Sequence, residues 1–161
     1  MGAFQDFSVS TYLPIGTIGL RLVVAALLGA IIGIEREWRN RPAGLRTHML
    51  TALAAALFTI LTGEILQSEM VQVQGDLARA DPIRVIEAVT SGVAFLAAGA
   101  IIQSRGAVHG LTTGAGMWLA GALGVAAGLG QFAIGGLAAF LGLIIISLLK
   151  RAETAVEKKA G

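Results

Sequence analysis

The chain contains no cysteine among its 161 residues, which excludes a disulfide framework and any thiol chemistry. Charge is also scarce, because Asp, Glu, Lys and Arg together make up only 14% of the chain. Hydrophobic residues account for 55%, glycine occurs 22 times, and the mean hydropathy is +0.78. This composition is too apolar and too rich in glycine for an ordinary soluble domain, and it predicts an integral membrane protein.

Uncharged stretches predict where the chain crosses the bilayer, since a helix needs about 20 residues to do so. The longest stretch, 106–149, lacks Asp, Glu, Lys and Arg and divides at the sequence GLGQ (128–131). The predicted helices are 17–36, 45–63, 83–103, 108–128 and 132–150. The predicted organisation is an outer N-terminal segment (1–16), a transmembrane domain (17–150) and a short basic cytoplasmic tail (151–161).

Positive charge is unequally divided between the two ends of these helices. Nine of the 12 Lys and Arg residues fall at one end and three at the other. Because Lys and Arg of short loops stay in the cytoplasm, the N-terminus is expected outside and the C-terminus inside. Residues 1–16 contain no Lys or Arg. The basic start of a signal peptide is therefore missing, and the first helix is expected to be retained.

The sequence matches itself at a shift of 66 residues. The coinciding positions include Gly33 and Gly99, Gly44 and Gly110, Leu45 and Leu111, and Thr47 and Thr113. Because each unit holds two helices, both units are expected to cross the membrane in the same direction. The predicted fold is therefore all-α and polytopic, with five transmembrane helices arranged as a parallel two-helix repeat plus a fifth helix.

Ionisable residues near the predicted helices form two candidate sites, because lipid cannot solvate charge and such groups need partners inside the bundle. At the cytoplasmic end we predict a functional polar cluster of Glu35, Arg36, Arg46, Thr47 and His48. In this cluster Glu35 is expected to pair with Arg46 across a tight loop. For Arg39 and Arg41, in the same loop, a functional role and a role only in orienting the protein in the membrane are about equally well supported.

At the outer end, the repeat places Arg21 and Glu87 at equivalent positions with opposite charge. This equivalence predicts a buried ion pair between the first and third helices. A bond between Glu87 and Arg84, one turn away on the same helix, is nearly as well supported.

Several other motifs are explained by a role in helix structure or packing, without a functional role. Asp81 and Pro82 are typical of an N-cap and the first residue of a helix. Glycines four residues apart predict close helix packing at three pairs: Gly29 and Gly33, Gly110 and Gly114, Gly124 and Gly128. His48 and His109 fall near the cytoplasmic surface, where a lone histidine is usually solvated, and they are too isolated in sequence to indicate a metal site.

Several motifs together resemble one known family. The segments GIEREWRNRPAGLRTH (33–48), DPIRV (81–85) and HGLTTG (109–114) follow one another in this order. Over about residues 21–130 the chain resembles the transmembrane domain of the MgtC/SapB family. This resemblance implies a bacterial inner-membrane protein with five spans that is linked with magnesium limitation.

The chain departs from the family pattern in two respects. It has AFLAAG (94–99) and TTGAGMW (112–118) where members often have GFLGAG and TTAAxLW, so local helix packing is expected to differ. Several members also carry a soluble C-terminal domain, whereas only about ten residues follow the fifth helix here. Regulation through such a domain is not expected.

The resemblance and the residues together favour ion homeostasis through regulation of another membrane complex by helix–helix contacts. The alternative is a transporter or channel for magnesium or a proton-coupled substrate. Magnesium prefers several oxygen ligands in octahedral geometry, however, and Glu35 and Glu87 are the carboxylates found at membrane level, at opposite ends. Direct transport is therefore the weaker hypothesis.

An enzyme is not expected, because the sequence offers no cysteine, metal-ligand cluster or serine beside a base. No cofactor is predicted, although bound magnesium stays open as an alternative. The expected partners are the lipid bilayer, another membrane protein or a second copy of the chain. Nucleic acid is not expected, since topology accounts for the basic residues.

Overall fold

The computed structural model describes residues 11–67, 83–104 and 107–160. This part of the chain contains α1 (Ile15–Trp38), α2 (Leu45–Gln67), α4 (Ile83–Gly99), β1 (Ile102–Ser104), β2 (Ala107–His109), α5 (Leu111–Gly128) and α6 (Phe132–Ala160). Three of these helices, α1, α2 and α5, are long and apolar enough to cross a membrane, and α6 has a shorter apolar stretch at Phe132–Ser147. The all-α prediction is confirmed, whereas five spans stay a prediction.

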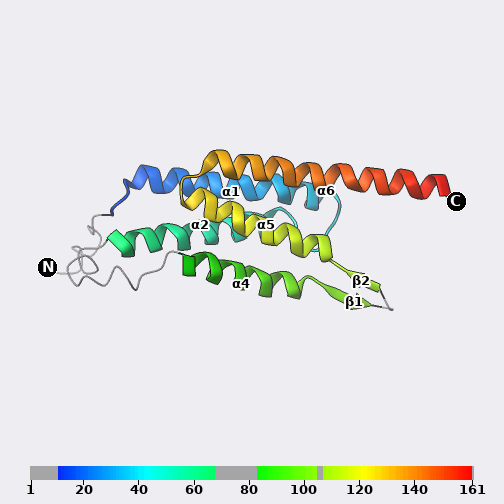
Figure 1. Ribbon diagram of the computed structural model, residues 1–161, viewed down its shortest axis with the longest axis horizontal. Coiled ribbons are helices and arrows are strands. Elements are labelled where there is room, and N and C mark those ends of the chain that lie inside the picture. The colour runs from blue at the N-terminus through cyan, green and yellow to red at the C-terminus, as the bar shows by residue number, and fades with distance from the viewer. Residues whose placement is uncertain (1–10, 68–82, 105–106, 161) are drawn as a thin grey trace.

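Successive helices run in opposite directions within one elongated bundle (Figure 1). α1, α2 and α5 pack against one another, α6 lies along α1 and α5, and α4 lies at the edge against α5 and α2. α1 and α4 point one way and α2 and α5 the other, as a parallel two-helix repeat requires. The two units differ in size, however, because α1 has 24 residues and α4 has 17.

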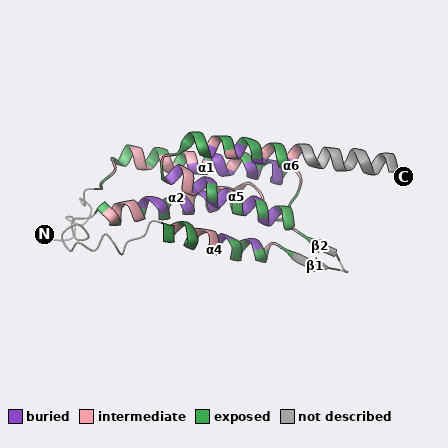
Figure 2. Ribbon diagram, in the orientation of Figure 1, coloured by how far each residue is buried: buried purple, intermediate pink, exposed green. Residues whose placement is uncertain are grey.

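The core lies where α1, α2, α5 and α6 meet, and α4 stands largely outside it (Figure 2). Many of its buried side chains are small, among them Ala25, Ala56, Ala127 and Ala139. Small residues let helix backbones approach closely, and this packing holds helices together in lipid, where apolar burial gives little driving force.

Two of the three predicted glycine pairs pack against α2. Gly29 and Gly33 of α1 face its first turns, and Gly124 and Gly128 of α5 face its middle. A Cβ on Gly33 would lie only 2.8 Å from the Cα atom of Leu45. The predicted close approach is therefore confirmed at these pairs, and the helix that they approach belongs to the same chain.

A β-hairpin separates α4 from α5, although the sequence predicts helix as far as residue 103 and again from 108. α4 ends at Gly99, and Ile102 of β1 pairs antiparallel with His109 of β2. Gly110 then precedes α5 with a φ of 89°, a conformation that glycine adopts without strain. These helix limits are wrong because apolar composition alone does not separate a short strand from a helix end.

Other predicted limits differ from the structure as well. α6 continues to Ala160 rather than ending at residue 150, and α1 and α2 each exceed their predicted ranges by a few residues. The predicted N-cap Asp81 and its neighbour Pro82 lie outside the described residues.

The α1–α2 loop, the hairpin and the C-terminus of α6 lie at one end of the bundle, which we call the hairpin end (Figure 1). The described N-terminal segment and the C-terminus of α2 lie at the opposite end. Arg36, Arg39 and Arg41 therefore share an end with the hairpin, as the uneven distribution of basic residues predicts.

Candidate functional site

The polar cluster at the hairpin end is built around a buried carboxylate. Glu35 and Arg36 occupy the last turn of α1 and are 8% and 2% exposed. The Nε atom of Arg36 donates to Oε2 of Glu35 at 2.6 Å, and Arg39, one turn further on, forms an ion pair with Oε1. Two guanidinium groups thus share one carboxylate, which leaves the cluster with net positive charge.

The predicted pair between Glu35 and Arg46 is wrong. Arg46 has an exposed side chain, and no ion pair of Arg46 occurs among the described residues. Both oxygens of Glu35 are instead occupied by arginines of α1 and its C-cap. The spacing of four residues from Glu35 to Arg39 was visible in the sequence, since residues at i and i+4 are neighbours on a helix.

A second carboxylate of this region binds backbone instead of a side chain. Oε2 of Glu37 accepts a hydrogen bond from the backbone N–H of Leu45 at 2.9 Å. This places a negative charge on the first residue of α2, where the helix dipole favours it. Gly44 permits this contact, because a Cβ at that position would overlap the carboxylate.

His48 is fully buried, whereas the sequence favours a solvated histidine. Its Nδ1 atom lies 2.9 Å from the carbonyl oxygen of Gly44, and because a carbonyl can only accept, Nδ1 carries the proton. The Nε2 atom is buried and has no hydrogen-bond partner among the residues that the structure describes. Thr47 beside it is half-buried, and its carbonyl oxygen accepts the hydroxyl of Thr51 at 2.8 Å. The cluster therefore holds Glu35, Arg36 and His48 as its buried members.

The predicted ion pair at the outer end is also wrong. Nη1 of Arg21 donates to the carbonyl oxygen of Gly128 at 2.7 Å, so Arg21 caps the C-terminus of α5. A cation is favourable there, because the last carbonyls of a helix lack intrahelical donors. Glu87 lies on the exposed surface of α4, and within the described chain it forms no ion pair, with Arg84 or any other cation.

Sequence reasoning missed one contact at the outer end. The carboxylate of Glu64, near the end of α2, accepts hydrogen bonds from the backbone N–H groups of Tyr12 and Leu13, at 2.7 and 3.1 Å. The segment before α1 is thereby held against α2. A contact between residues about 50 positions apart has no periodic signal that the sequence could show.

Metal ligands are poorly represented. Within the part of the chain that the structure describes, no group of three or more His, Asp or Glu side chains can hold a metal ion. The most buried carboxylate, Glu35, is engaged by Arg36 and Arg39. These residues therefore do not fit a resident magnesium ion, which prefers an octahedral set of oxygen ligands.

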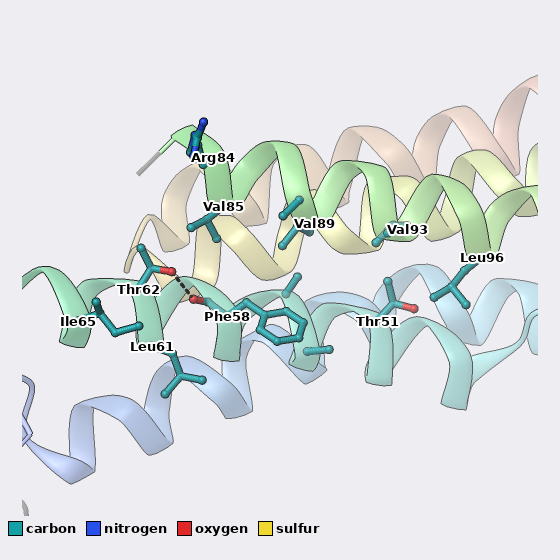
Figure 3. A pocket seen from close by; sticks show the side chains of 14 residues that line it. Thr51, Phe58, Leu61, Thr62, Ile65, Arg84, Val85, Val89, Val93 and Leu96 are labelled. Atoms are coloured by element: carbon teal, nitrogen blue, oxygen red, sulfur yellow. Dashed lines mark hydrogen bonds between the residues drawn. The ribbon is translucent and has the colours of Figure 1, made fainter. Parts of the chain in front are cut away.

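An apolar cavity of about 710 Å³ lies between α2 and α4 (Figure 3). Phe58 of α2 and Val89 and Leu96 of α4 are among the side chains that line it. The hydroxyls of Thr51 and Thr62, also in the lining, donate to carbonyls of their own helix. The cavity thus suits an apolar side chain or acyl chain and not an ion.

Comparison with known proteins gives concordant matches. A model described as the MgtC family matches residues 22–155. Protein SrpB of Synechococcus elongatus is 36% identical over 156 residues, which cover 88% of this chain and 81% of that protein. No solved structure gives a significant match.

Two further relatives are longer than the matched region. Protein MgtC of Salmonella typhimurium is 42% identical over 113 residues, covering 70% of this chain and 44% of its own length. The Escherichia coli protein named "Putative magnesium transporter YhiD" is 33% identical over 133 residues, covering 80% of this chain and 59% of its own length. This chain therefore spans less than two thirds of either relative. With three helices able to span a bilayer and these matches over most of its length, the chain is a membrane protein and belongs to the MgtC family.

Proposed function

We propose that this chain is an inner-membrane protein of magnesium homeostasis that regulates another membrane protein through helix contacts and catalyses no reaction. Its membership of the MgtC family, and the name given to the relative YhiD, support the link with magnesium. In this proposal all five helices cross the membrane, the N-terminus lies outside, and the hairpin end faces the cytoplasm. The excess of basic residues at the hairpin end supports this orientation.

The observation that carries the proposal is the open side of α4. Only Val93 and Ala97 of its 17 residues are buried, against ten buried residues in α5. Glu87, one turn into the helix, is exposed and has no ion-pair partner among the described residues. A carboxylate at partial membrane depth is costly in lipid. A partner helix that presents a cation or a hydrogen-bond donor to Glu87 would remove this cost.

Small residues on α4 leave room for such a helix. A Cβ on Gly92 or on Gly99 would meet nothing within 4 Å, in contrast to the glycines that α1 and α5 use against α2. Ser91 is exposed beside them, one turn beyond Glu87. Small, unoccupied positions of this kind allow a second helix to approach closely.

Transport of magnesium by the chain itself is the second candidate, and the name of YhiD favours it. The geometry supports it less. Glu35 is neutralised by two arginines at the hairpin end, while Glu87 lies one turn into α4, which begins at the opposite end (Figure 1). Two carboxylates so placed do not form a site for a hydrated divalent cation.

Photo-crosslinking in cells tests the proposal. A photoreactive phenylalanine analogue placed at Ser91 on α4 is compared with one at Phe140, which is 60% exposed on α6. We expect position 91, and not position 140, to form an adduct with another membrane protein, and the adduct to change with magnesium supply. Adducts with lipid alone, with a second copy alone, or equally from both positions would refute the proposed partner.

Two matched glycine substitutions sharpen this test. Gly92→Leu and Gly136→Leu both add a side chain where a Cβ meets nothing within 4 Å, so both variants are expected to fold. Gly92→Leu should abolish the adduct from position 91, whereas Gly136→Leu should leave it intact. Magnesium uptake by liposomes that contain only the purified chain would instead favour the transporter.

A further inference from the structure

A cavity at the hairpin end, separate from the apolar one, is lined by basic and hydroxyl-bearing residues. It has a volume of about 490 Å³ and lies between the C-terminus of α1, the first turn of α5 and the side of α6. Arg36 and Arg41 line it from one side, His109 and Thr112 from another. Two cations beside an open helix N-terminus are a typical environment for an anion.

The end of α1 brings the two arginines together. Asn40 has a φ of 50°, and its N–H donates to the carbonyl oxygen of Glu37 at 3.0 Å. The N–H of Arg41 donates to the carbonyl oxygen of Arg36 at 3.1 Å. These two bonds and the left-handed residue form a Schellman motif. The motif folds the chain back on its last helical turn, so that Arg41 lies beside Arg36.

Arg36 presents unpaired donors to the cavity from a buried position. The residue is 2% exposed, and its Nε atom is used by Glu35. No hydrogen bond of its two terminal nitrogens occurs among the described residues, and Arg36 is one of the residues that line the cavity. A buried guanidinium with two free nitrogens is a strong bidentate donor to an oxyanion.

The first turn of α5 supplies further donors. Gly110 is its N-cap and has no side chain to bond the free N–H groups, and no acceptor of the Leu111 to Thr113 amides occurs within the described residues. Thr113 is 2% exposed and lines the cavity, and no hydrogen bond of its hydroxyl occurs in that part of the chain. The helix dipole adds a partial positive charge at this point.

The internal repeat shows what the equivalent helix start holds. Position 45 of α2 corresponds to 111 of α5, and at position 45 the N–H binds the carboxylate of Glu37. The residue 66 positions after Glu37 is Gln103, which carries no charge. The first unit therefore neutralises its helix start with its own anion, whereas the second has an uncharged residue at the equivalent position.

We propose that this cavity binds a phosphate group, either inorganic phosphate or the head group of an anionic phospholipid. Arg36, Arg41 and the amides at the start of α5 donate to the phosphate oxygens, and the hydroxyl of Thr113 adds one bond. Ile145 and Ile146 of α6 form an apolar wall, which can accommodate the glycerol and upper acyl atoms of a lipid. Glu35 holds Arg36 in place through the Nε atom. Because Glu35 is also paired with Arg39, the group of one carboxylate and two guanidinium groups keeps a net positive charge.

Binding to the purified chain in detergent tests the proposal in two arms, both in phosphate-free buffer. Equilibrium dialysis measures the affinity for radiolabelled inorganic phosphate, and native mass spectrometry measures retention of added phosphatidylglycerol. We expect Arg41→Gln to weaken binding about tenfold or more and Thr113→Val about fivefold, because a charged hydrogen bond contributes more than a neutral one. Neither change removes a partner of Glu35, so both variants are expected to fold.

Arg46→Gln is the matched control, since Arg46 is an exposed arginine of the same end that does not line the cavity. Sensitivity of phosphate binding to Arg41 and Thr113, but not to Arg46, supports the site with free phosphate as its ligand. The same pattern for phosphatidylglycerol alone supports the lipid head group. Binding of neither ligand, or equal losses in the Arg41→Gln and Arg46→Gln variants, would overturn the proposal.

Discussion

The imidazole of His48 is packed against Gly116, so that a Cβ on residue 116 would lie 3.0 Å from its Nε2 atom. The ring thus occupies space that any other residue of α5 at this position would fill. On its other side, Gly29 and Gly33 of α1 approach the backbone and Cβ of His48. A histidine at the centre of three helices is therefore accommodated by glycines on both neighbours.

Gly116→Ala is expected to destabilise the protein by about 1–3 kcal/mol, the typical cost of adding a methyl group to a packed interior. Gly136→Ala is the control, because a Cβ there meets nothing within 4 Å. Alanine also favours helix over glycine by about 1 kcal/mol, so the control should be neutral or stabilising. Thermal unfolding in detergent measures both. An unchanged melting temperature for Gly116→Ala would mean that the imidazole of His48 can shift to make room for the added methyl group.

Glu35→Ala should destabilise the chain more than Glu37→Ala. Removing Glu35 leaves two arginines without their counterion, one of them buried, at a cost of about 3 kcal/mol. Removing Glu37 deletes an exposed cap of α2, which typically costs about 1 kcal/mol. The yield of folded protein and its melting temperature in detergent distinguish the two. Equal losses would show that the buried pair contributes no more than the cap does.

Arg21→Ala and Glu87→Ala should have additive effects. Arg21 caps α5 through Gly128, and its loss should cost about 1–2 kcal/mol, while Glu87→Ala should have little effect on the isolated chain. Because the two side chains do not meet, the double variant should equal the sum of the single ones within about 0.5 kcal/mol. A double-mutant cycle of thermal stability measures this. A larger coupling energy would show that Arg21 and Glu87 interact, as the internal repeat predicted.

The sequence predicted the helices well and their polar contacts poorly, for a physical reason. Apolar length and glycine spacing are local properties, so α1, α2 and the glycine faces against α2 could be predicted. The bond from Arg21 to Gly128 joins residues 107 positions apart through a backbone carbonyl, and a backbone acceptor leaves no trace in residue type. The internal repeat suggested Glu87 as the partner of Arg21 because it relates equivalent sequence positions. Equivalent positions in two units need not lie close to each other in space.

The hairpin end shows the same division. The prediction that Glu35, Arg36 and His48 lie near one another rests on the short loop 39–44, and the structure buries all three residues around this loop. The same prediction assigned the wrong partner to Glu35, since the direction of Arg46 depends on how α2 rotates against α1. The cavity beside Arg36 was also missed, because it forms only where the Schellman motif and the start of α5 meet.

The arrangement of the helices makes a prediction about sidedness. Asn40 in the α1–α2 loop and Val108 in the hairpin lie at the same end of the bundle, whereas Tyr12 lies at the other (Figure 1). All three side chains are exposed. Because the chain has no cysteine, each position can be replaced by a single cysteine without a background signal.

A membrane-impermeant thiol reagent added to intact cells with a permeabilised outer membrane should label Tyr12→Cys and spare Asn40→Cys and Val108→Cys. All three should be labelled after the inner membrane is opened. The same grouping with the opposite accessibility would reverse the orientation, so that the basic residues of the hairpin end face outward against the usual distribution. Labelling of Asn40→Cys and Val108→Cys from different sides would contradict the fold itself, because it would place the hairpin and the α1–α2 loop at opposite ends.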